Sequence, residues 1–176
     1  MSTKPAHTHS TLRDTVVGRV RVEHGETTQA TGQQFDIFQE FTAIAAPSVT
    51  KIVATQPIDI DNIEFNVLLN GGSVSVFEAA SGSEGGTFTP LVPVSSNQRL
   101  NPAPTFSAST GGTFIPSAAP LRKMSAQAVA NSSASKSTRG RLSLLAGTYF
   151  VVTGLLSGVL SLTGDLVITI SEAIEP

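Results

Sequence analysis

The sequence predicts an all-β protein: an antiparallel β-sandwich over residues 16–176, for which a jelly roll is one candidate form, preceded by a flexible N-terminal arm over residues 1–15. Several short segments alternate apolar and polar residues with a period of two, which is the pattern of half-buried strands. Gly, Pro, Asn and Ser separate these segments at spacings of about 8–12 residues. Regular helical patterns do not occur between them, so a sandwich is favoured over a parallel α/β sheet.

The N-terminal part of the chain combines a polar stretch with an alternating one. Residues 1–15 carry no long apolar run, so we expect an arm without a core of its own and no signal peptide. Residues 16–24 predict the first strand, with Val16, Gly18, Val20 and Val22 on one side and Val17, Arg19, Arg21 and Glu23 on the other. Residues 25–34 are polar and predict a loop.

Two segments then lead to the centre of the chain. Residues 35–42 alternate, but the spacing of Phe38 and Phe41 also fits a helix, so strand and helix both remain open. Residues 49–54 predict a strand. A turn or the start of the next strand is then marked by Pro57, Asp59 and Asp61.

The clearest strand runs from Ile63 to Leu69, where apolar and polar residues alternate. The sequence Asn70-Gly71-Gly72 follows, and Asn and Gly tolerate the positive φ angles of tight hairpin turns. Residues 74–78 alternate again. We therefore expect a hairpin in one sheet, with the C-terminal strands in the other sheet.

The next region is rich in Gly, Ser and Pro. Residues 81–86 predict a flexible loop, and a short strand passes through Phe88 and Leu91. Two more short strands, one at Phe106 and one at Phe114, are expected on either side of a Gly111-Gly112 turn. After them, residues 121–130 fit a helix or an edge strand, and residues 131–136 fit a mobile surface loop.

Residues 149–170 have about the length of a transmembrane helix. They nevertheless contain Gly154, Gly158, Gly164 and Asp165, and they alternate like strands. A charged residue near the centre of a bilayer costs roughly 2.5–3.5 kcal/mol. Two strands over residues 148–155 and 163–173, joined by a Gly/Ser turn, fit better than a membrane span.

Charged residues make up 14% of the chain, while hydrophobic residues make up 40%. Small neutral polar residues replace the missing charges, and such surfaces suit packing against other subunits. The net charge of −2 and the scattered basic residues do not favour binding to nucleic acid. One loose basic group is interpreted as a solvated loop or a subunit contact: Arg122, Lys123, Lys136, Arg139 and Arg141.

A search for catalytic chemistry assigns no catalytic, cofactor-binding or metal-binding residue. The chain has no Cys and three histidines, of which His7 and His9 could chelate a metal but fit an unstructured tail better. No Gly-x-Ser-x-Gly motif is present, and no glycine pair opens a phosphate-binding loop. Asp59, Asp61 and Glu64 could hold Ca²⁺, but turn and solvated-face roles are favoured. We therefore expect a protein that is not an enzyme and needs no cofactor.

A series of short phrases follows one another along most of residues 20–172. They are Glu23-His24, Ile63-Glu64-Phe65-Asn66-Val67, Gly71-Gly72-Ser73-Val74-Ser75-Val76-Phe77-Glu78, Gly85-Gly86-Thr87-Phe88-Thr89-Pro90, Ser95-Ser96-Asn97-Gln98-Arg99, Ala146-Gly147-Thr148-Tyr149-Phe150-Val151-Val152 and Asp165-Leu166-Val167-Ile168-Thr169-Ile170. The order of these phrases resembles a family of small β-sandwich proteins of tailed phages, the capsid decoration (cement, or head auxiliary) proteins.

The resemblance implies a β-sandwich that binds the outside of a phage capsid and cements it, often as a trimer. The implied partners are the major capsid protein and further copies of the chain, without nucleic acid or membrane. The implied location is the capsid surface of the virion, after synthesis in the host cytoplasm. We further hypothesise that residues 1–15 anchor on the capsid or on a neighbouring copy.

The alternative from another class is a receptor- or glycan-binding module of a phage tail fibre or head fibre. Glycan binding favours exposed Trp and Tyr as stacking platforms. The chain has no Trp and a single Tyr, Tyr149, which lies in an apolar segment and is expected in the core. The composition therefore favours the decoration role.

Overall fold

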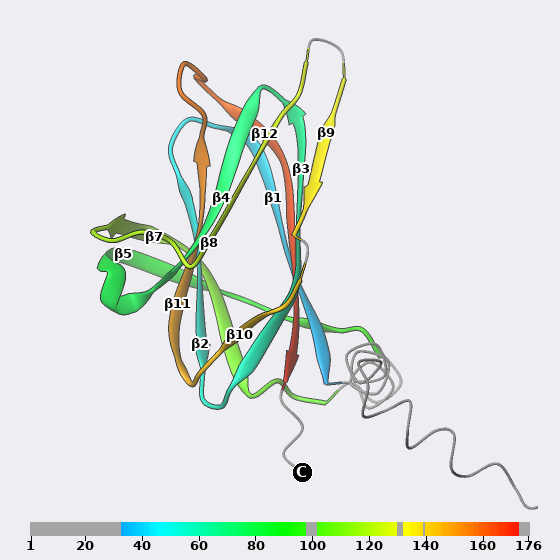
Figure 1. Cartoon of the computed structure of the whole chain (residues 1–176), viewed down its shortest axis with the longest axis vertical. Helices are drawn as coiled ribbons and strands as arrows, with labels where there is room; N and C mark the ends of the chain where they lie inside the picture. Colours follow the sequence, from blue (N-terminus) through cyan, green and yellow to red (C-terminus); the bar gives the residue numbers. More distant parts are fainter. Residues whose placement is uncertain (1–32, 98–101, 130–131, 139, 173–176) are drawn as a thin grey trace, which may run out of the picture.

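The computed structural model describes residues 33–97, 102–129, 132–138 and 140–172. The predicted arm over residues 1–15 and the predicted strand over residues 16–24 lie outside the described residues. The described chain forms two antiparallel sheets packed face to face, so the prediction of an all-β sandwich is confirmed (Figure 1). No described helix is long and apolar enough to cross a membrane.

Within the described ranges, each sheet contains six strands. Sheet A has the order β10-β3-β12-β1-β6, and β9 also pairs with β3. Its strands are β1 (Gln34–Ile44), β3 (Ile58–Leu69), β6 (Val94–Ser95), β9 (Ala134–Ser137), β10 (Leu142–Leu144) and β12 (Leu162–Glu172). Sheet B has the order β5-β7-β2-β11-β4-β8. Its strands are β2 (Ser48–Ala54), β4 (Gly71–Glu78), β5 (Gly82–Leu91), β7 (Phe106–Pro116), β8 (Arg122–Gln127) and β11 (Gly147–Leu155).

The strand pairing has jelly-roll topology. β1 pairs with β12, β2 with β11, β3 with β9 and β10, and β4 with β8, so early strands pair with late strands in reverse order. This is the arrangement produced when one long β-hairpin folds around a core. It contains two Greek keys, which form the two packed sheets. The segment that contains β5, β6 and β7 is inserted between β4 and β8.

The core lies between the inner faces of the two sheets. Period-two alternation supplies it, because every second side chain of a strand points inward. The side chains with the largest buried volume include Phe35, Phe41, Phe65, Ile37, Ile52, Ile60, Ile63, Leu162, Leu166 and Ile168. Burying one such side chain stabilises the fold by roughly 1.5–3 kcal/mol.

The Asn70-Gly71 turn is present, but the predicted hairpin is wrong. Asn70 has a φ of 68°, yet β3 lies in sheet A and β4 in sheet B. A Cβ atom at Gly72 would lie 2.8 Å from the Phe65 ring, so glycine lets the chain cross the end of the core. A turn signal indicates that the chain reverses, whereas burial against distant strands decides which sheet each strand joins.

The expected placement of the C-terminal strands is wrong for the same reason. β11 joins sheet B beside β4, and β12 joins sheet A beside β3. The two strands exist close to their predicted bounds, but they do not share a sheet.

Other segments differ from the expectations or settle open alternatives. The expected loop over residues 81–86 is largely the start of β5, and β7 continues without interruption through the expected Gly111-Gly112 turn. Residues 35–42 belong to β1 and are therefore a strand. Residues 122–127 form the edge strand β8, so the edge-strand alternative for this segment is confirmed. The expected surface loop over residues 131–136 contains the first part of β9.

Candidate interaction surfaces

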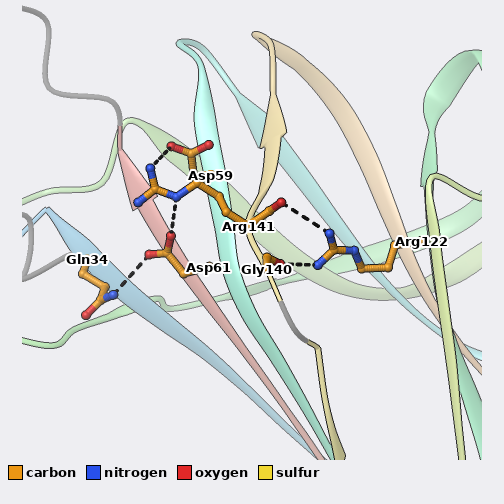
Figure 2. A network of polar contacts seen from close by, with 6 residues as sticks. All are labelled: Gln34, Asp59, Asp61, Arg122, Gly140 and Arg141. Carbon is orange, nitrogen blue, oxygen red and sulfur yellow. Dashed lines mark hydrogen bonds and ion pairs between the residues drawn. The ribbon is translucent and has the colours of Figure 1, made fainter. Parts of the chain in front are cut away.

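The two aspartates predicted to mark a turn or a strand start lie within β3, beside Arg141. The Arg141 guanidinium contacts the Asp59 carboxylate at 3.3 Å and donates to the Asp61 carboxylate at 3.0 Å (Figure 2). Gln34 Nε2 also donates to Asp61 at 3.2 Å. The positive charge next to both carboxylates is thus supplied by the chain itself, and the described residues contain no group of three potential metal ligands.

Two arginines of the predicted basic group, Arg122 and Arg141, lie side by side, and the contact between them joins the two sheets. Arg122 on β8 of sheet B donates to the carbonyl oxygens of Gly140, at 2.5 Å, and Arg141, at 3.3 Å (Figure 2). Gly140 and Arg141 directly precede β10 of sheet A, so this contact ties the two sheets together. Lys123 and Lys136, together with Arg122, line an open hollow of about 380 Å³ between β8 and β9. Arg139 lies outside the described residues.

Four connections meet at one end of the sandwich, at the top of Figure 1. They link β1 to β2, β3 to β4, β8 to β9 and β11 to β12. We call this surface the loop end and define it by residues 43–48, 68–72, 127–129, 132–133 and 155–162. None of these residues is charged, although 14% of the whole chain is.

The loop end exposes large apolar side chains that sequence reasoning did not single out. The exposed fractions are 57% for Leu68, 56% for Leu69, 71% for Val129 and 88% for Leu160. Three of these four side chains, but not Leu160, line an open hollow of about 590 Å³, whose full lining is Leu68, Leu69, Asn70, Ala128, Val129, Ser132 and Ser133. Exposed apolar surface rimmed by polar groups is typical of protein–protein contact sites.

Hydrogen bonds from Asn70 and its neighbour Gly71 join the connections at the loop end. Asn70 Nδ2 donates to the Ser161 carbonyl at 2.8 Å, and the Asn70 carbonyl accepts from the Ala128 amide at 2.8 Å. The Leu156 amide donates to the Gly71 carbonyl at 3.2 Å. The apolar side chains are therefore presented on connected loops, which lowers the entropy lost when a partner binds.

The outer face of sheet B is covered by a part of the chain that we call the flap, formed by residues 82–88 of β5 and 111–116 of β7. Phe114 of the flap stacks on Phe150 of β11, with ring centroids 4.3 Å apart, and also contacts Phe77 of β4. Lys51 Nζ pairs with Glu84 at 2.6 Å and lies 5.3 Å from the centre of the Phe88 ring. These aromatic residues form a second apolar cluster, so this face is already occupied.

Tyr149 lies in the core, as predicted. It is buried, and its hydroxyl donates to the Leu145 carbonyl at 2.9 Å. It is therefore not a stacking platform for a glycan. Within the described part of the chain, Phe38 on β1 is the one aromatic residue among the exposed large hydrophobic side chains.

Comparisons with known proteins identify no family for this chain. No family model and no curated protein matches the chain. A structure of the VP2 subviral particle of infectious bursal disease virus is 9% identical, with a TM-score of 0.13, and the match covers 81% of this chain and 40% of that one. A structure of the Gt strain of that virus is 13% identical, with a TM-score of 0.12, and the match covers 78% and 39%. The chain thus spans less than half of those viral chains, and TM-scores this low do not show a shared fold.

Proposed function

We propose that this chain is a structural virion protein that binds the outside of a phage capsid and stabilises it, acting as a homotrimer without catalytic activity. The observation that carries the proposal is the loop end, an uncharged and partly apolar surface on a jelly-roll scaffold. The proposed partner of the loop end is the major capsid protein. The order of sequence phrases supports the same role independently.

The physical demands of cementing a shell agree with a modest apolar contact. Burying one exposed leucine contributes roughly 1.5–3 kcal/mol, so a single loop end gives a weak contact. Three copies at a local threefold position multiply that affinity without any new type of contact. A surface without charges also makes binding insensitive to salt, since no exposed ion pair has to form.

The proposal is tested with capsids purified from a phage that lacks the gene for this chain. The chain is added, and occupancy is measured by co-sedimentation. Leu160→Asp places a charge in the proposed contact and should weaken binding about tenfold or more. Ile115→Asp is the matched control, because Ile115 is 68% exposed but lies on the flap.

Two results would overturn the proposal. One is the absence of binding to the capsid shell, including the case in which the chain binds at the tail tip alone, which would favour the fibre module. The other is equal binding of the Leu160→Asp and Ile115→Asp variants, which would remove the loop end as the contact surface.

A further inference from the structure

One edge of sheet A is open within the described chain. β1 pairs with β12 over nearly its whole length, but on its other side it pairs with β6 only at Phe35 and Asp36. From Ile37 to Ile44, no described strand lies along that side. Every second backbone amide and carbonyl of such an edge points away from the sheet and can pair with an added strand.

The side chains of β1 restrict which strand can be added. Ile37 and Phe41 point into the core and are buried. On the opposite face, Asp36 and Glu40 flank Phe38, which is 57% exposed. A matching strand therefore has apolar residues on its inner face and basic residues on its outer face. A second copy of β1 does not match, because it would place carboxylates beside carboxylates.

Residues 16–24, which lie outside the described residues, have the required pattern. Their alternation places an apolar set on one side (Val16, Gly18, Val20, Val22), while the other side carries two basic residues and one acidic residue (Val17, Arg19, Arg21, Glu23). The arginines can pair with the carboxylates and stack on the exposed Phe38 ring. The nine residues between His24 and Gln34 can span about 30 Å, which is enough to pass β6 and reach Ile37 from the same chain.

We propose that residues 16–24 pair antiparallel with the open edge of β1 in the same chain, with Arg19 and Arg21 above Asp36, Phe38 and Glu40. The direction has a consequence for function. An antiparallel strand begins beside the C-terminal end of β1, which is at the loop end. Residues 1–15 would then emerge beside the apolar side chains of the loop end, and their use as a capsid anchor there rests on the proposed function.

Hydrogen exchange on the full-length chain, without capsids, tests the pairing. The outward amides of β1 from Ile37 to Ile44 should be protected in the wild type. Val20→Pro and Arg21→Pro each fix φ and remove one amide, and one of these two amides must face β1. At least one variant should speed exchange of the outward amides about tenfold or more. Ser10→Pro, a proline in the arm, is the matched control and should change nothing.

The β1 amides that face β12 serve as an internal reference, since a general loss of the fold would expose them as well. Unprotected outward amides in the wild type would overturn the proposal. So would equal exchange in Val20→Pro, Arg21→Pro and Ser10→Pro. Because no capsid is present, either result leaves capsid binding to be judged separately.

Charge reversal and dilution sharpen the test. The double variant Arg19→Glu/Arg21→Glu should lose protection, and the further change Glu40→Lys should restore part of it. No restoration would overturn the charge pairing. Protection that is unchanged on hundredfold dilution supports pairing within one chain. Protection that disappears on dilution would assign the strand to a neighbouring copy and overturn the intramolecular proposal.

Discussion

At the scale of single residues, Arg141 shows how this chain uses its few charges. Its guanidinium contacts the buried Asp59 and the half-buried Asp61, and its backbone carbonyl accepts from Arg122. The sequence places all four residues in loose charged groups but does not reveal that β3, β8 and the segment before β10 meet. That meeting depends on long-range pairing, so the contacts could not be predicted.

We expect Arg141→Ala to lower the free energy of unfolding by about 1–3 kcal/mol, because two partly buried carboxylates lose their cationic partner. Denaturant unfolding measures the change. Lys136→Ala is the control, because Lys136 is exposed and has no ion pair among the described residues. A loss for Arg141→Ala no larger than that of the control would contradict the structural role of Arg141.

Tyr149 gives the fold a dependence on alkaline pH. Burial raises the pKa of the Tyr149 hydroxyl above its ordinary value, and the nearby Glu78 carboxylate raises the pKa further. The folded state therefore holds this proton more tightly than the unfolded state does. The stabilisation is fully present below pH of about 10 and is lost as pH rises through the raised pKa.

Because Tyr149 is the only tyrosine and the chain has no Trp, tyrosinate absorbance reports on this residue alone. The folded chain should titrate at a higher pH than the chain in denaturant. Tyr149→Phe should lose about 1 kcal/mol at neutral pH with the hydrogen bond to Leu145, and its stability should fall less steeply above pH of about 10. Identical titrations of the folded and unfolded chain would refute the assignment.

At the scale of elements, alternation predicted most strands of the main sandwich but not their partners. Asn70 correctly indicated a turn, and non-local burial decided that this turn joins two sheets. The sequence predicts two short strands where the structure has the single strand β7, because Gly111-Gly112 fits a turn. In the structure these glycines, both with positive φ, bend β7 so that Phe114 reaches Phe150.

Gly112 offers a direct test of the flap. A Cβ atom there would lie within 2.4 Å of the Phe88 ring, and its φ of 55° also disfavours side chains. Gly112→Ala should therefore destabilise the chain by about 1–3 kcal/mol more than Gly140→Ala, as measured by denaturant unfolding. Gly140 is matched because its φ is 88° but nothing lies within 4 Å of its Cβ position. Equal effects would mean that the packing of Phe88 on Gly112 contributes nothing.

At the scale of the whole molecule, the sequence predicts the all-β class but not the interaction surface. Leu68, Val129 and Leu160 are far apart in the sequence, and they lie at the same end of the sandwich only because jelly-roll topology brings their connections there. One usable signal was present, since the segments between these strands lack charged residues. The topology was needed to show that the uncharged segments form one surface.

The proposed trimer predicts a mass in solution of three times the 18.2 kDa of one chain. Sedimentation equilibrium over a wide range of concentrations measures it. A mass of one chain at every concentration would rule out a preformed trimer and would require assembly on the capsid itself.

The orientation of the chain on the capsid is the most direct test of the proposed contact between the loop end and the shell. Electron cryomicroscopy of capsids decorated with the wild-type chain resolves which end of the sandwich contacts the shell. We predict density at regular positions over the whole shell, with the β3–β4 corner and the β11–β12 connection against the capsid protein. Density in which the opposite end of the sandwich, where Arg141 contacts Asp59 and Asp61, faces the shell would contradict the proposed cementing role. So would density confined to the tail.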